Sequence, residues 1–83
     1  MSVASHSRDL SQLKVGESAL IEEVIGDDSL AVRLMEMGVL EGESISLIGA
    51  APFGDPLEFE IRSYRLSLRR HEAQRVLLSS SGN

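Results

Sequence analysis

Apolar and polar residues alternate through most of the second half of the chain, which predicts a protein built mainly from β-strands. Residues 57–62 and 65–69 each place every second side chain on an apolar face, the period of a half-buried strand. Residues 44–48 and 18–25 follow a similar pattern, and a closing strand is expected at 74–78. Five short strands in 83 residues favour a small, partly open barrel of the SH3-like kind.

One helix is expected to interrupt the strands. An aspartate of the pair Asp27–Asp28 can cap its first turn. Gly38 stands one position past its end, where a left-handed cap strongly favours glycine. Together these features predict a helix of about ten residues inserted into the barrel. The helical face expected to be buried consists of Leu30, Leu34 and Met37.

The first strand carries an irregularity. Ala19 and Ile21 share one face, but Glu22–Glu23 breaks the alternation before Val24. One inserted residue of this kind is typical of a β-bulge, which bends a strand. We therefore expect a bulge at these glutamates that helps the sheet to curl.

The two runs after residue 56 are expected to pair as a hairpin. If residues 63–64 form a two-residue turn, Ile61 faces Leu66 across it, and apolar side chains meet along the inner face. On the outer face, Glu58 then lies opposite Arg69. Matching apolar pairs and opposite charges both favour this register.

Residues 50–56 form a proline-rich interruption between strands. Neither Pro52 nor Pro56 can donate a hydrogen bond to a strand ladder, so this segment is expected to be a loop. Phe53 at its centre has two interpretations, a plug for the end of the barrel or an exposed anchor for a partner protein. We favour the plug.

The charge is divided unevenly along the chain. The net charge is −5, with 12 acidic and 3 basic residues in 1–60, against 1 acidic and 5 basic residues in 61–83. An acidic chain argues against nucleic-acid binding, which needs a dominant basic surface. The arginine-rich third could face an acidic protein partner, although a solvated strand face is the simpler interpretation.

The residues offer little chemistry. There is no cysteine and no phosphate-binding glycine loop, and no serine has an ordered histidine and aspartate to activate it, so we expect no enzyme. His6 falls in a predicted tail, which leaves His71 and the adjacent Glu72 as weak metal candidates. Helix capping explains Asp27–Asp28 without a cation. We expect no bound metal and no cofactor.

The domain organisation is simple. We expect a flexible N-terminal tail at 1–9, one domain at 10–78 and a flexible C-terminal tail at 79–83. No apolar run approaches the roughly 18 residues of a membrane span, and the first residues lack the apolar stretch of a secretory signal. A cytoplasmic protein is the expectation.

The order of motifs resembles the ferrous iron transport protein A (FeoA) family over residues 10–78. The motifs are Leu13-x-x-Gly16, Arg33-Leu34-x-x-Met37-Gly38-Val39-x-x-Gly42, Ala51-Pro52-Phe53-Gly54-Asp55-Pro56 and Leu66-x-Leu68-Arg69-x-x-Glu72-Ala73. The resemblance implies an SH3-like barrel that serves a bacterial ferrous iron uptake system as a cytoplasmic accessory protein. Its implied partner is the membrane permease, whose cytosolic part carries a GTP-binding domain and would recruit the module to the inner face of the membrane.

Within that interpretation the chain is a non-catalytic protein-interaction module that docks on the permease and modulates transport. The alternative is a metal-responsive regulatory module that binds a divalent transition metal weakly. An exposed edge strand could also pair with a second copy. The residues expected to contact the partner, chosen by predicted exposure and chemistry, are Arg33, Met35, Glu36, Phe53, Asp55, Arg65 and Arg69.

Overall fold

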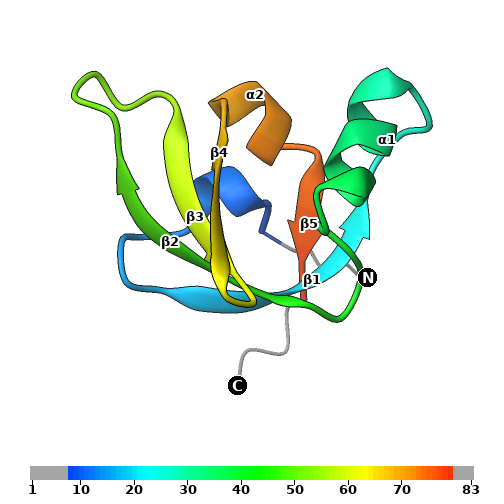
Figure 1. Cartoon of the computed structure of the whole chain (residues 1–83), viewed down its shortest axis with the longest axis horizontal. Helices are drawn as coiled ribbons and strands as arrows, with labels where there is room; N and C mark the ends of the chain where they lie inside the picture. Colours follow the sequence, from blue (N-terminus) through cyan, green and yellow to red (C-terminus); the bar gives the residue numbers. More distant parts are fainter. Residues whose placement is uncertain (1–7, 80–83) are drawn as a thin grey trace, which may run out of the picture.

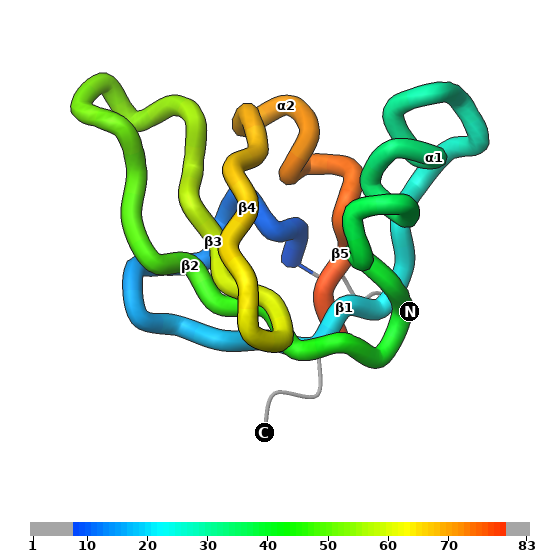
Figure 2. Tube along the Cα trace, in the orientation of Figure 1, coloured from blue at the N-terminus to red at the C-terminus, as the bar shows by residue number. Residues whose placement is uncertain are grey.

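A computed structural model describes residues 8–79 as a strongly curled antiparallel sheet with one helix inserted between its first two strands (Figure 1). The strand order is β4-β3-β2-β1-β5, and the curl is plainest in the tube of Figure 2. The predicted mainly β architecture is confirmed. The elements are η1 (Leu10–Gln12), β1 (Ser18–Val24), α1 (Ser29–Glu36), β2 (Ser44–Ala50), β3 (Leu57–Ile61), β4 (Tyr64–Leu68), α2 (Arg70–Ala73) and β5 (Val76–Leu78).

The core lies inside the curl of the sheet. Strand β3 shows the predicted alternation, with Leu57, Phe59 and Ile61 buried and the two glutamates between them exposed. Helix α1 closes one side through Leu34, which is fully buried. The other two members of its predicted stripe, Leu30 and Met37, are partly buried against the same cluster. Burial of these apolar side chains is the main stabilising term for so small a domain.

Both ends of α1 are capped as the sequence indicates, although the helix has 8 residues and not about ten. At its start the Asp28 carboxylate accepts from the Ala31 N–H at 3.3 Å. At its end Gly38 has φ +94°, and the Val39 N–H donates to the Leu34 carbonyl at 3.0 Å. That bond belongs to a Schellman cap. The Tyr64 hydroxyl, from β4, donates to the carbonyl of the last residue before the glycine.

The predicted bulge is present in β1. Ile21 pairs with Leu78 and Glu23 pairs with Leu77, so Glu22 is the extra residue. The bulge lies where β1 leaves β2 and continues along β5. It therefore marks the bend that lets one strand take part in both sides of the barrel.

The predicted hairpin register is wrong by two residues. The turn consists of Arg62 and Ser63, and Ile61 pairs with Tyr64 instead of Leu66. A shift of two leaves every side chain on the same face, so alternation alone does not distinguish the two registers. A tertiary contact favours the observed one: Arg62, at φ +58°, donates from Nε and Nη2 to the Glu43 carboxylate at 3.1 and 3.0 Å.

Residues next to the expected domain boundaries, 8–9 and 79, also form backbone or capping hydrogen bonds. The Arg8 carbonyl accepts from the Leu78 N–H at 2.8 Å, and the Asp9 carboxylate caps η1. At the other end the Ser79 N–H donates to the Leu20 carbonyl at 2.8 Å. The rest of both expected tails, including His6, lies outside the described residues.

Candidate functional site

Three elements lie next to one another at one end of the barrel: the loop at 51–56, α2 and α1, along the top of Figure 1. Arg70, the first residue of α2, holds the loop. Its Nε donates to the Gly54 carbonyl and its backbone N–H to an Asp55 carboxylate oxygen, both at 2.9 Å. On the other side, Arg33 of α1 reaches Glu72 of α2 at 3.4 Å. We call this surface the Phe53 end; it consists of Arg33, Phe53, Asp55, Arg69, Arg70 and Glu72.

Phe53 is 98% exposed, so the prediction that it plugs the barrel is wrong. The barrel interior is already filled by Phe59 and aliphatic side chains, which leaves no place for a second ring. The loop also closes on itself, because the Gly54 N–H donates to the Ala51 carbonyl at 2.7 Å and the Ala51 N–H to the Pro56 carbonyl at 3.0 Å. The ring is therefore presented to solvent on a braced loop.

Arginines accompany this exposed ring. The Arg33 side chain is 61% exposed despite its contact with Glu72. Arg69 is exposed, and its backbone N–H donates to the Glu72 carboxylate at 2.8 Å. Glu72 is thus occupied on both sides, by a guanidinium of α1 and by the N-terminus of α2. An exposed aromatic ring and exposed arginines on one end of the barrel are residue types enriched in protein interfaces.

The remaining predicted contact residues lie elsewhere. Met35 and Glu36 are on the last turn of α1, where Met35 is 47% exposed. Arg65 lies on β4 and pairs across the hairpin with Glu60, near the opposite end from Phe53. The structure therefore connects Asp55 to α2 through Arg70, and α2 to Arg33 of α1 through Glu72. Met35 and Glu36 lie on α1 beside Arg33, and Arg65 lies apart from all of them on β4.

The weak metal candidates do not form a ligand set. His71 is exposed, and Glu72 is held by Arg33 and the Arg69 N–H. Within residues 8–79 there is no group of three or more histidine, cysteine, aspartate or glutamate side chains placed to hold a metal ion.

Asp28 is engaged as a structural carboxylate. Arg75 donates to its two oxygens at 3.0 and 2.6 Å, and the Ala31 N–H donates at the helix start. These hydrogen bonds, that from Arg75 first, hold the pKa of Asp28 well below its usual range. The pair ties the start of α1 to the residue before β5, in agreement with the capping role expected for this aspartate.

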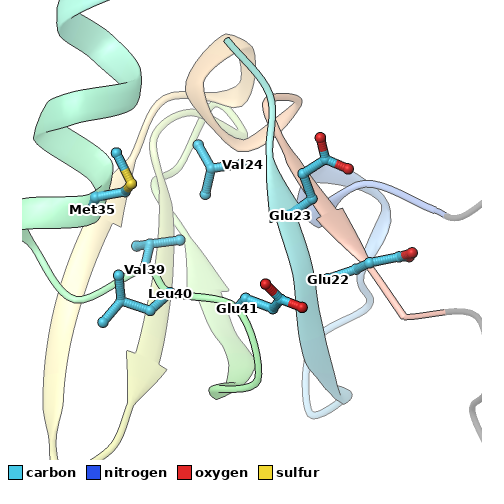
Figure 3. A pocket seen from close by; sticks show the side chains of 7 residues that line it. All are labelled: Glu22, Glu23, Val24, Met35, Val39, Leu40 and Glu41. Atoms are coloured by element: carbon cyan, nitrogen blue, oxygen red, sulfur yellow. The ribbon is translucent and has the colours of Figure 1, made fainter. Parts of the chain in front are cut away.

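A second surface was not predicted from the sequence. A pocket of about 180 Å³ opens between β1 and the segment that follows α1. The bulge at Glu22 and the exposed Leu40 between two glycines were the available signals, but neither identifies a pocket without the tertiary arrangement. Its lining residues are Glu22, Glu23, Val24, Met35, Val39, Leu40 and Glu41 (Figure 3).

In the described part of the chain, no helix has the length and apolar character needed to cross a membrane.

Among proteins of known function, the chain is 37% identical over 75 residues to an Fe(2+) transport protein A/Fe(2+) transporter FeoB fusion protein of Porphyromonas gingivalis. The match covers 87% of this chain and 9% of that relative, so the chain spans a small part of its length.

Solved structures agree with the fold. A FeoA-like protein from Clostridium acetobutylicum superposes with a TM-score of 0.84 at 26% identity, over 95% of this chain and 92% of the other. A zinc-complexed FeoA from Stenotrophomonas maltophilia, described as a prokaryotic SH3 domain protein, gives 0.76 at 30% identity, over 90% and 93%. The expected SH3-like barrel is confirmed by these relatives.

The family assignment rests on sequence as well as fold. The FeoA domain profile matches residues 8–80, which is nearly the whole chain. That range begins at Arg8, whose carbonyl accepts from the Leu78 N–H of β5. The chain belongs to the FeoA domain family.

Proposed function

We propose that this protein is a non-catalytic accessory module of a bacterial ferrous iron uptake system, and that it docks on the cytosolic GTP-binding region of the permease. The observation that carries the proposal is the fusion relative, in which Fe(2+) transport protein A and the transporter FeoB form one protein. Linking two modules raises their effective concentration for each other, which benefits only parts that work together.

The Phe53 end is the surface we propose for this docking. Its ring is 98% exposed on a loop that Arg70 braces at 2.9 Å, so little conformational entropy remains to be lost on binding. Arg33 and Arg69, which both contact Glu72 of α2, are exposed on the same end of the barrel and can pair with carboxylates of a partner. Asp55 is a poorer contact residue, because its carboxylate already accepts from the Arg70 N–H.

Docking would modulate transport by favouring one conformation of the permease. A partner shifts such an equilibrium only by its differential affinity for the two states, and each tenfold difference corresponds to about 1.4 kcal/mol. The cytosolic region would present two such states if bound nucleotide changes its surface. The proposal therefore expects the affinity of the module to differ between the nucleotide-bound and nucleotide-free forms.

The test is an amide NMR titration of the labelled protein with the isolated cytosolic domain, with and without nucleotide. We expect shifts to cluster on the loop at 51–56, α2 and the outer side of α1. Phe53→Ala should remove them, whereas Val15→Ala, also an exposed apolar residue at 67% but in the turn before β1, should not. Absence of shifts up to millimolar concentrations, or equal loss in both variants, would refute docking through this surface.

A further inference from the structure

The two strands at the ends of the sheet differ in whether their outer sides are covered. The strand order places β4 at one end and β5 at the other. The outer side of β5 is covered, because Asp9 forms a β-bridge with Leu77 and the Arg8 carbonyl accepts from the Leu78 N–H at 2.8 Å. Within residues 8–79, β4 pairs only with β3. We call its outer side, residues 65–69, the β4 edge.

The hairpin geometry determines which backbone groups of the β4 edge face outward. The turn between β3 and β4 has two residues, so the flanking pair Ile61–Tyr64 is joined by hydrogen bonds, and such pairs recur at every second position. Arg65 and Ser67 therefore direct their N–H and C=O groups away from β3. In the described part of the chain, no group outside β3 forms a hydrogen bond with either residue.

These outward groups can accept a further strand. An edge with free N–H and C=O groups is a template for strand addition, in which main-chain hydrogen bonds supply affinity. In an antiparallel arrangement, as in every strand pair of this sheet, Arg65 and Ser67 would each exchange hydrogen bonds with one residue of the added strand. The next outward N–H, that of Arg69, is already bound by the Glu72 carboxylate at 2.8 Å, so the added strand is short.

Two arginines determine the charge of the β4 edge. Arg69 follows β4 with an extended backbone, φ −67° and ψ 155°, so by alternation it lies on the same outer face as Arg65. Arg65 lies opposite Glu60 of β3, but neither guanidinium forms an ion pair with a carboxylate of residues 8–79. Opposite charges directly across a strand pair attract and like charges repel. The edge therefore favours a strand with carboxylates and disfavours a basic one.

The inner face of the β4 edge favours an apolar neighbour. Leu66, between the two residues with outward backbone groups, is only partly buried against the core, whereas Leu68 is 1% exposed. An apolar side chain opposite Leu66 would remove its remaining surface from water. A β-branched side chain is preferred at such a position, because it packs well on a pleated surface.

We propose that the β4 edge binds an extended acidic segment of a partner protein as an additional antiparallel strand. The segment places carboxylates opposite Arg65 and Arg69 and an apolar side chain opposite Leu66, and its main chain bonds to Arg65 and Ser67. This inference does not rest on the docking proposed above, because neither Phe53 nor its loop takes part.

The test uses a synthetic probe and the whole protein. The probe is a capped peptide with the order glutamate-valine-threonine-valine-glutamate, titrated into labelled protein. We expect amide shifts to cluster at Arg65, Leu66 and Ser67. N-methylation of the third and fifth residues of the peptide removes the N–H groups that face β4 and should abolish these shifts. N-methylation of the second and fourth residues, whose N–H groups face away, should leave binding intact.

Matched variants distinguish this edge from general charge attraction. Arg65→Gln should weaken peptide binding by about two- to fivefold, the range expected for an exposed ion pair. The control, Lys14→Gln, removes the same charge from an exposed residue before β1 and should have little effect. Phe53→Ala should bind the peptide normally while losing the cytosolic domain, so failure of this proposal is distinguishable from failure of permease docking.

Several outcomes would overturn the proposal. These are no shifts on β4 up to millimolar peptide, equal binding of the two N-methylated peptides, or equal effects of Arg65→Gln and Lys14→Gln. Equal binding of a peptide with lysine in place of glutamate would contradict the preference for an acidic segment. Concentration-dependent shifts on β4 without any peptide would assign the edge to a second copy of this chain instead.

Discussion

The Phe53 end and the β4 edge differ in what they offer to a partner. The first is a projecting aromatic ring on a loop braced by the contacts of Arg70 at 2.9 Å. The second is a strand edge at which the backbone groups of Arg65 and Ser67 face outward. Binding at the first would depend on a side chain, whereas binding at the second would depend chiefly on the main chain. A small barrel can in this way offer two kinds of contact.

The largest expected effect is the difference in stability between the alanine variants of the two phenylalanines. Phe59 is fully buried in the core, so Phe59→Ala should lower the free energy of unfolding by about 3–5 kcal/mol. Phe53→Ala should change it by no more than about 0.5 kcal/mol, since that ring is 98% exposed. Urea denaturation of both variants measures the difference. Similar destabilisation by the two would mean that the Phe53 ring packs against the domain.

The next effect concerns the cap at the end of α1, which Tyr64 at the start of β4 contacts. Gly38 has φ +94°, and a Cβ there would overlap the Tyr64 hydroxyl. Gly38→Ala should cost about 1–3 kcal/mol in the free energy of unfolding. Gly49→Ala is the control, because a Cβ at Gly49 meets nothing within 4 Å. A neutral Gly38→Ala would contradict the role given to this cap.

Removing the Phe53 ring should have a smaller effect than these losses of stability, and it should change only the affinity for the cytosolic domain. An exposed aromatic anchor is typically worth about 2 kcal/mol when truncated, so Phe53→Ala should weaken binding of the cytosolic domain by a factor of about 30. Arg65→Ala, on β4 away from this end, should leave the affinity nearly unchanged. Calorimetry or the NMR titration measures both. The reverse order of effects would move the docking surface to the hairpin.

The smallest expected effect is a pH dependence of the folding stability, caused by the Asp28–Arg75 ion pair at the start of α1. The pKa of Asp28 is lowered in the folded state, chiefly by its hydrogen bonds from Arg75. The stabilisation of the fold by the ionised Asp28 carboxylate is therefore fully present above the pKa of an unfolded aspartate, about 4. It is lost as the pH falls toward the lower pKa of the folded state.

Asp28→Asn keeps a capping side chain but removes the charge. The variant should be less stable than the wild type at neutral pH, and the gap should narrow below about pH 4. Thermal unfolding from pH 7 to pH 2 follows this gap, and Asp27→Asn serves as the control on the neighbouring exposed aspartate. A constant gap across that range would mean that the Arg75 pair does not contribute through charge.

The sequence by itself determined the elements and their faces. Alternation in β3, the stripe on α1, the aspartate at its start and the glycine at its end each follow from local geometry that a few neighbouring residues impose. The bulge at Glu22 was visible for the same reason, because an inserted residue disturbs the alternation wherever the strand lies.

Only the tertiary structure decided the features that depend on residues distant in sequence. The hairpin register differed because Arg62 binds Glu43, and Tyr64 reaches the end of α1. Phe53 stayed outside because Phe59 and its neighbours fill the core. The pocket beside β1 exists because β1 and the segment after α1 meet in space. Local patterns fix which face of an element is apolar, but packing decides which elements meet there and what remains exposed.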